Sequence, residues 1–227
     1  MKKFAFLLSI LFLLFLFTAS AYALPTAQIR ISDGVTTVTL TDNALGDGLA
    51  QEGAILFSGT VGNFIINVET GLSKPILGAA SLPHMDLSSS NTSVGTGGTL
   101  TVEFSDTGFT GVVPGFLTKV GGTAGGTFQL DTYLDNSNAI FFIWTNLSTL
   151  GPFGAGAFSG ESSASATPVS PYSLTFMATI NHGPSVTGTV TSFDAELTAV
   201  PEPATMLLSG LGLLSLGVYL RRRSKKA

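Results

Sequence analysis

The chain has 227 residues, no cysteine and a formal net charge of −4, with 44% hydrophobic and 11% charged residues. The lack of cysteine excludes a disulfide framework, thiolate metal sites and cysteine nucleophiles. Seven of the ten basic residues lie in positions 1–3 and 221–227, so residues 24–199 hold three basic and thirteen acidic residues, a balance of −10. Such a surface repels polyanions, and nucleic acid is disfavoured as a partner.

The N-terminus has the features of a secretory signal peptide. Two lysines precede an apolar stretch at 4–18, and small residues follow at Ala21 and Ala23, where a signal peptidase reads its substrate. We predict that residues 1–23 are a signal peptide cleaved after Ala23, with a retained N-terminal anchor as the alternative. The body of the protein would then be one exported domain at 24–199.

The body is predicted to consist of β-strands. Apolar and polar residues alternate in segments such as 37–41 and 100–104, and no stretch between 24 and 200 has a convincing helical period. Segment 139–144 is apolar on both faces and is expected to be a central, fully covered strand. The expected strands are 28–32, 37–41, 54–60, 64–69, 100–104, 128–131, 139–144, 172–176 and 191–197. This pattern predicts an all-β fold, an antiparallel β-sandwich or its jelly-roll variant.

Gly, Asn, Ser and Pro clusters separate the strands. Residues 61–63 are expected to form a hairpin connection, and Asp135-Asn136-Ser137-Asn138 a turn. The Gly/Ser/Thr-rich segments 88–98, 121–126 and 154–166 are expected to be surface loops.

The C-terminus is predicted to contain a membrane span. The uncharged run of 17 residues at 204–220 would extend about 25 Å as a helix, the short end of what crosses a hydrocarbon core of about 30 Å. The alternative is a buried helix in the core of a soluble domain. A basic anchor follows the run and should stay cytoplasmic, which places everything upstream outside the cytoplasmic membrane. Its residues are Arg221, Arg222, Arg223, Lys225 and Lys226.

A short proline-containing motif, Val200-Pro201-Glu202-Pro203, precedes the span. The two prolines donate no backbone hydrogen bond and hold the chain extended. Together, the motif, the apolar run and the basic end at 200–227 resemble the PEP-CTERM sorting signal of Gram-negative bacteria. The resemblance implies an exported substrate of exosortase, a membrane-embedded cysteine enzyme that removes the tail, in bacteria that make exopolysaccharide and biofilm. Segments 62–75 and 83–87 also resemble a body sequence that recurs among such proteins and has no assigned activity.

The sequence contains little that indicates a catalytic site. There is no Gly-x-Ser-x-Gly and no phosphate-binding loop, and the two histidines, His84 and His182, are expected at the surface or in a turn. Four acidic residues on or near strands could pair as in a glycosidase, but their spacing fits outward faces of strands equally well. These are Glu103, Asp106, Asp131 and Asp194.

No cofactor is expected, and calcium is the one candidate. Asp42 and Asp47 in one loop, or Asp131 with Asp135, would supply oxygen ligands. Neither pair matches the EF-hand pattern, and aspartates in loops usually stabilise turns.

The sequence therefore indicates a non-enzymatic exported protein, processed by signal peptidase and exosortase, with a structural or adhesive role in an exopolysaccharide or biofilm matrix. A carbohydrate-binding module is the alternative, and it would show exposed aromatic side chains, such as Tyr133 or Trp144, along a groove. An enzyme is the third reading and would show a cleft with converging acids or a histidine.

Overall fold

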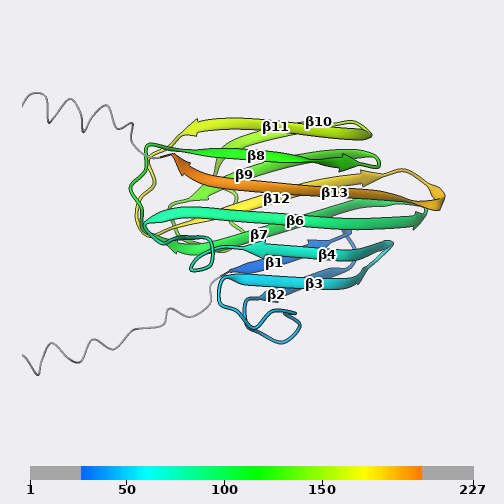
Figure 1. Ribbon diagram of the computed structural model, residues 1–227, viewed down its shortest axis with the longest axis horizontal. Coiled ribbons are helices and arrows are strands. Elements are labelled where there is room, and N and C mark those ends of the chain that lie inside the picture. The colour runs from blue at the N-terminus through cyan, green and yellow to red at the C-terminus, as the bar shows by residue number, and fades with distance from the viewer. Residues whose placement is uncertain (1–26, 201–227) are drawn as a thin grey trace, which may run out of the picture.

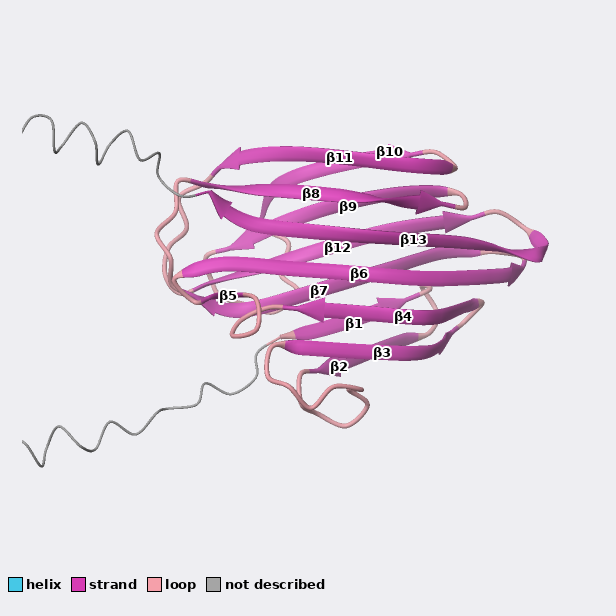
Figure 2. Cartoon of the chain, in the orientation of Figure 1, coloured by secondary structure: helices cyan, strands magenta, loops and turns pink. Residues whose placement is uncertain are grey.

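The computed structural model describes residues 27–200, which form thirteen β-strands in two antiparallel sheets that lie face to face (Figure 1). Within this range the structure has strands and loops but no helix (Figure 2), and so none that could cross a membrane. The prediction of an all-β antiparallel fold is confirmed for these residues. The predicted signal peptide, membrane span and basic anchor lie outside them.

The two sheets have similar sizes. Sheet 1 has the order β10 (Thr145–Phe153), β9 (Thr127–Asp135), β12 (Tyr172–His182), β7 (Gly98–Phe109), β1 (Gln28–Ser32) and β2 (Thr37–Thr41). Sheet 2, in front in Figure 1, has the order β11 (Gly156–Ser165), β8 (Gly115–Ala124), β13 (Ser185–Val200), β6 (Leu82–Gly95), β4 (Phe64–Leu72) and β3 (Ala54–Val61). The short strand β5 (Gly78–Ala79) pairs only with β6.

Strands β6 to β13 have jelly-roll topology. The chain crosses from one sheet to the other at every connection in this range except the one between β9 and β10. The resulting neighbours, β6-β13-β8-β11 in one sheet and β7-β12-β9-β10 in the other, are the two four-stranded halves of a jelly roll. Strands β3 and β4 extend one edge, and β1 and β2 extend the sheet behind it.

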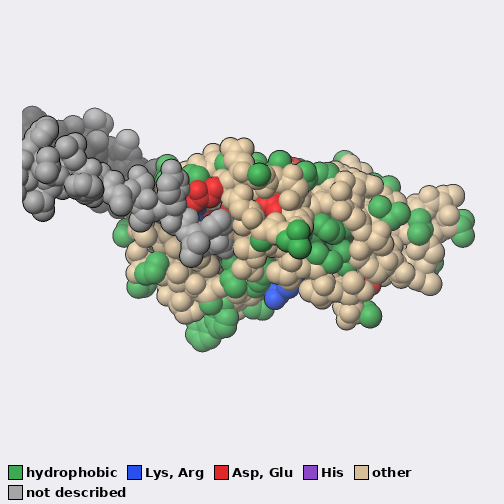
Figure 3. All heavy atoms as spheres, turned by 90° about the horizontal axis from the view of Figure 1, so that it is seen from below, with side chains coloured by type: hydrophobic (Ala, Val, Ile, Leu, Met, Phe, Trp, Pro, Cys, Tyr) green, Lys and Arg blue, Asp and Glu red, His purple; other side chains and the backbone are tan. Residues whose placement is uncertain are grey.

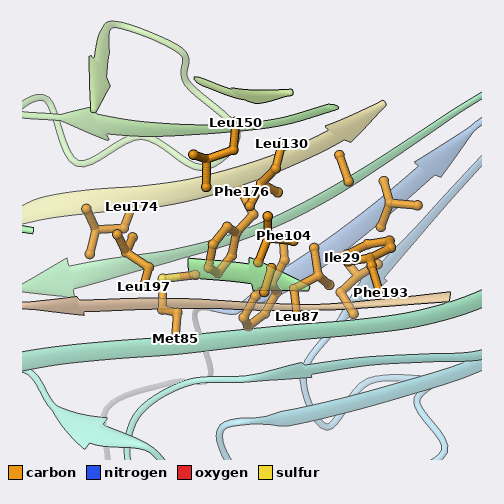
Figure 4. Close-up of a cluster of buried hydrophobic side chains, with 14 of the residues drawn as sticks. Ile29, Met85, Leu87, Phe104, Leu130, Leu150, Leu174, Phe176, Phe193 and Leu197 are labelled. Atoms are coloured by element: carbon orange, nitrogen blue, oxygen red, sulfur yellow. The ribbon is translucent and has the colours of Figure 1, made fainter. Parts of the chain in front are cut away.

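The core lies between the sheets, because each strand turns alternate side chains inward. Figure 4 shows Ile29, Phe104 and Phe176 of sheet 1 facing Leu87 and Phe193 of sheet 2, all at most 3% exposed. Burying each side chain of this size contributes about 1.5–3 kcal/mol. Hydrophobic burial therefore carries the stability of a domain that has no disulfide.

The prediction of a central strand at 139–144 is wrong. This segment is the connection between β9 and β10, and it crosses the outer face of sheet 1. Asn138 and Phe141 have positive φ angles of 61° and 56°, which turn the chain out of the extended conformation. Phe141 packs on the sheet, whereas Phe142, Ile143 and Trp144 are exposed. The segment therefore has apolar residues on both sides although only one side is covered.

The three segments expected to be loops are also largely wrong, since β6 continues to Gly95, β8 to Ala124, and β11 spans Gly156–Ser165. Small residues there serve close backbone packing. A Cβ added at Gly122 would lie 2.2 Å from the carbonyl oxygen of Ser192 on β13. The predicted hairpin at 61–63 and the turn after Asp135 are confirmed.

Candidate functional site

The strand β13 ends at the sorting motif. Val200 is its last residue and pairs with Gly115 of β8, one residue beyond the predicted end of the domain. β13 lies between β6 and β8 in the interior of sheet 2. The motif residues Pro201, Glu202 and Pro203 lie outside the described residues, and they follow the strand without a linker.

An aromatic pair projects from the β9–β10 connection. The rings of Phe142 and Trp144 are stacked, with centroids 6.0 Å apart and planes 16° apart, and the side chains are 43% and 73% exposed. Both line a shallow hollow of about 320 Å³ with Asp135, Asn136 and Ser137. Flat exposed rings beside polar groups can stack on a sugar ring or another planar apolar surface. We call Phe142 and Trp144 the aromatic pair.

Asp135 holds the start of this connection. Its Oδ1 accepts a hydrogen bond from the Ser137 amide at 3.0 Å, and its Oδ2 accepts bonds from the Ser137 hydroxyl at 2.5 Å and the Ala139 amide at 2.9 Å. Burial alone would raise the pKa of Asp135, but these hydrogen bonds outweigh it and lower the pKa. The carboxylate is therefore ionised at neutral pH and occupied in shaping the loop.

The middle of the connection is fixed to the outer face of sheet 1. Arg30 makes a forked ion pair with Glu103 at 2.5 and 2.7 Å, and the Phe141 ring covers the Arg30 guanidinium at 4.3 Å from its centroid. The Phe141 amide donates to Ser105 Oγ at 3.1 Å, and Ser173 Oγ donates to the Ala139 carbonyl at 2.7 Å. The aromatic pair is thus presented by a loop with defined contacts. Tyr133, the other aromatic candidate, is half-buried on β9 and does not line the hollow.

A second hollow of about 490 Å³ lies on the outer face of sheet 2. Its lining includes the small residues Ser88, Ser90, Gly121 and Ser192 together with Asp194. The Ser88 hydroxyl donates to Asp194 Oδ1 at 2.5 Å. Hydroxyls and a carboxylate on an open surface suit hydrogen bonding to a hydroxyl-rich polymer.

More titratable groups lie beside this hollow. Burial, with the nearby negative charges of Asp194 and Glu196, raises the pKa of Asp86 to about 6. His84 Nε2 lies 2.8 Å from Glu196 Oε1, so this histidine is on the outer face of β6, beside the sheet as expected.

His182 is not at the surface, which corrects the prediction. It is 4% exposed at the end of β12, where Nδ1 contacts Ser93 Oγ and Nε2 contacts Thr191 Oγ1, both at 2.7 Å. Burial lowers its pKa, so the ring is held neutral. His182 therefore connects sheet 1 to two inward polar side chains of sheet 2.

Three of the four strand carboxylates expected on solvated faces are buried, and each is bound by protein groups. Glu103 pairs with Arg30, Asp106 accepts bonds from Ser73 Oγ and Lys74 Nζ, and Asp131 accepts bonds from Gln129 and Thr149. Only Asp194 is exposed. Asp131 and Glu103 therefore stabilise the outer face of sheet 1.

The calcium candidates stabilise their own loops. Asp47 Oδ1 accepts the amides of Leu49 and Leu56, and its Oδ2 accepts the amide of Asn43, all at 3.0 Å. Asp42 Oδ2 accepts the Gly53 amide at 2.7 Å, and burial raises the pKa of Asp42. Within residues 27–200 no group of three or more His, Asp or Glu side chains is placed to hold a metal ion. Calcium binding by Asp42, Asp47, Asp131 or Asp135 stays a prediction.

Sequence reasoning missed a buried carboxyl group on β4. Glu69 is fully buried, and neither of its oxygens accepts a hydrogen bond of good geometry from any residue in the range 27–200, although Ser89 lies beside it. Burial raises its pKa to about 8. The irregularity in β-pairing between Ile66 and Val68 shifts the alternation by one residue, so Glu69 points inward although the pattern of the strand predicts outward.

Comparisons with known proteins identify only the C-terminal signal. The family described as "PEP-CTERM protein-sorting motif" matches residues 199–223. No curated protein sequence matches the chain.

Similarity to solved structures is low. The K3 cleaved adhesin domain of Lys-gingipain from Porphyromonas gingivalis w83 is 12% identical, with a TM-score of 0.26 over 50% of this chain and 74% of that one. The Stig cyclase Fisc from Fischerella sp. TAU is 13% identical, with a TM-score of 0.33 over 66% of this chain and 86% of that one. The tailspike protein 4 of Bacteriophage CBA120 is 10% identical, with a TM-score of 0.31 over 70% and 21%. Scores this low support no transfer of function.

The sorting match starts at residue 199 and so includes the last two residues of β13, which ends at Val200. The signal marks an exported protein whose precursor is associated with the membrane and is processed by exosortase. Residues 199–223 of this chain are a PEP-CTERM protein-sorting motif.

Proposed function

We propose that this protein is a non-enzymatic component of the outer envelope or extracellular matrix, where it adheres to exopolysaccharide or biofilm polymers after sorting. The observation that carries the proposal is the sorting signal at 199–223, attached without a linker to a complete β-sandwich. The sandwich is the part that would remain after exosortase removes the tail.

The surface of the domain supports a role among hydrated polymers. Seen from below, most of it consists of small polar side chains and backbone, with few and scattered charged groups (Figure 3). The hollow on sheet 2 offers hydroxyls of Ser88, Ser90 and Ser192 beside the Asp194 carboxylate. Such groups can exchange hydrogen bonds with sugar hydroxyls without a large desolvation cost.

The sorting step is tested by replacing Glu202 in cells that carry the exosortase. We expect Glu202→Ala to accumulate as a larger, membrane-bound precursor, with the mature form lost from the envelope or medium. Glu161→Ala, at an exposed position on β11, is the matched control and should be processed normally. If Glu202→Ala protein reaches its normal size and location, the proposed sorting role is wrong.

A carbohydrate-binding module is the second candidate, and the aromatic pair favours it. Trp144 and Phe142 are exposed, stacked and held beside polar groups in a shallow hollow. Stacking of a base or sugar-like ring on an aromatic side chain is worth about 1–3 kcal/mol, so Trp144→Ala should weaken binding about 5- to 150-fold. Retardation in gels containing purified polysaccharides measures this directly. Unchanged retardation of the Trp144→Ala protein, compared with a Val186→Ala control, would contradict it.

A further inference from the structure

Both ends of the described chain lie at one end of the sandwich. Residue 27 precedes the start of β1, and Val200 ends β13; the start of β1 and the end of β13 both lie toward the left side of the sandwich in Figure 1. Five connections meet at this end: residues 42–53, which are hydrogen-bonded to residue 27 and Ser73, and residues 73–81, 110–114, 136–144 and 166–171. We call the last four connections, with Val200, the C-terminal pole.

Hydrogen bonds join the four connections into one surface. The amides of Thr110 and Gly111 donate to the Ala80 carbonyl at 2.7 and 3.1 Å, and the Ala166 amide donates to the Pro114 carbonyl at 3.1 Å. The Val169 amide donates to Asn136 Oδ1 at 2.8 Å. Figure 2 shows two of these loops side by side at the left end of the sandwich, next to the end of β13. The four connections of the pole therefore form one continuous surface held by hydrogen bonds.

The pole is largely apolar, and the acidic residues at this end, Asp42, Asp47 and Glu52, lie in the neighbouring connection 42–53. Its four connections contain one charged residue, Lys74, which is bound to Asp106 and to the Thr107 carbonyl. Large hydrophobic side chains are exposed on it or at its border: Ile76 37%, Leu82 52%, Val112 87%, Ile143 54%, Trp144 73% and Val169 61%. At the opposite end Val35 and Val186 are exposed at separate hairpin tips, with no aromatic side chain among the exposed hydrophobics there.

The covalent connection to the predicted span is short. Four peptide steps join Val200 to Ala204, so the two residues cannot be more than about 14 Å apart in any conformation. The polar headgroup layer of each leaflet is about 5–8 Å thick. If residues 204–220 enter the hydrocarbon core, the pole has little room to stand away from the membrane surface.

We propose that the C-terminal pole lies on the lipid bilayer in the membrane-anchored precursor, with Val112, Val169 and Trp144 in the interfacial layer. The inference rests on the proposed anchoring by the sorting signal. Aliphatic side chains and tryptophan on a surface with few charged groups suit the headgroup region, where apolar area is buried and an indole N–H stays hydrated. This orientation would hold Pro201-Glu202-Pro203 at the membrane surface, within reach of a membrane-embedded enzyme.

Trp144 is the only tryptophan in the chain, so it reports on the pole without labelling. The full-length chain is reconstituted into phospholipid vesicles, and its fluorescence is measured with acrylamide in the water and with brominated lipids in the bilayer. We expect a blue-shifted emission, strong quenching by brominated lipids and loss of most of the acrylamide quenching seen for the exposed indole in water.

Paired variants test which surface is responsible. Val112→Glu with Val169→Glu should restore acrylamide quenching and abolish brominated-lipid quenching, while Val35→Glu with Val186→Glu at the opposite end should change neither. All four positions are largely exposed, so folding is expected to be unaffected, and equal unfolding midpoints check this.

The outcomes distinguish contact of the C-terminal pole with the bilayer from anchoring of the chain by its C-terminal segment. A chain that floats with vesicles while Trp144 stays accessible to acrylamide overturns the inference and leaves the proposed anchoring intact. Shielding that disappears on dilution of the protein in the bilayer, or appears only with added polysaccharide, overturns it in favour of a second copy or of a sugar. A full-length chain that does not float overturns the anchoring and the inference together.

Discussion

Glu69 makes the stability of the sandwich depend on pH. Its carboxyl group points into the core from β4, beside Ser89, and Asn91 Oδ1 nearby also lacks a hydrogen bond within the described residues. Burial raises its pKa from the usual 4.5 to about 8, because the charged form loses its hydration without gaining a partner. Replacement by glutamine keeps the shape and removes the titration.

The sign follows from proton binding. Between pH 4.5 and about 8 the folded protein holds a proton on Glu69 that the unfolded chain has lost, so the free energy of unfolding falls as pH rises through this window. Each pH unit is worth about 1.4 kcal/mol, which gives a loss of about 3–4 kcal/mol between pH 5 and pH 8. In Glu69→Gln this part of the pH dependence disappears.

Urea unfolding of the exported domain at pH 5 and pH 8, followed by circular dichroism, measures the effect. The difference between the two pH values should be about 3–4 kcal/mol smaller in Glu69→Gln than in the wild-type protein. Other titrating groups are common to both proteins and cancel in this comparison. Glu161→Gln, exposed on β11, should behave as wild type. Equal pH dependence of Glu69→Gln and wild-type protein would refute the buried, neutral carboxyl group.

Three further changes test the packing. Gly71→Ala should destabilise the domain by about 1–3 kcal/mol, because its Cβ would lie 2.7 Å from the buried Phe104 ring; Gly154→Ala, with open space around it, is the control in the same urea titration. Arg30→Met should cost about 1–3 kcal/mol by leaving its buried carboxylate partner unpaired, and Arg30→Lys should recover only part of this because it lacks the fork; thermal unfolding compares them. His182→Gln should reduce acid sensitivity: burial lowers the pKa of His182, so stability is lost as pH falls below 6.5, which denaturant midpoints at pH 7 and pH 5 report.

Local alternation predicts the strands well where one face meets the core. The bounds predicted for β1 and β2 agree with the structure, and the start of β4 at Phe64 does too. β1 and β2 alternate strictly, and the turn-forming residues Asp33, Asp42 and Asn63 stand next to the ends of the three strands. The fold class follows because many such segments need a second sheet to cover their apolar faces.

The alternation of apolar and polar residues does not predict the structure where contacts between distant parts of the chain determine it. Segment 139–144 is as apolar as a central strand, but sheet 1 covers it on one side only, and the side chains on its other side are exposed. Asn138 and Phe141 have positive φ angles, and the segment is held by hydrogen bonds from the Phe141 amide to Ser105 and from Ser173 to the Ala139 carbonyl, partners that lie more than 30 residues away. A short stretch of sequence around residues 139–144 does not contain those partners, so the local pattern could not predict these contacts.

Two other failures have the same origin. The Ser-rich part of β6 is a strand because β4 and β13 pair with it on both sides, and local composition alone indicates a loop. The inward direction of Glu69 depends on one irregular pair between β4 and β6. For the site, the sorting motif was recognisable because it is contiguous, whereas the aromatic pair needed the fold to show that Trp144 is exposed.

The position of β13 connects the fold to export. β13 is the last strand of the described residues 27–200, and it lies between β6 and β8, so sheet 2 cannot join its two parts until residues 185–200 are available. In an exported chain these residues leave the membrane last, immediately before the sorting signal. We therefore expect the sandwich to close only when the signal itself reaches the membrane. Completion of the domain and presentation of the processing site would then be the same event, because Pro201 directly follows Val200 in the chain.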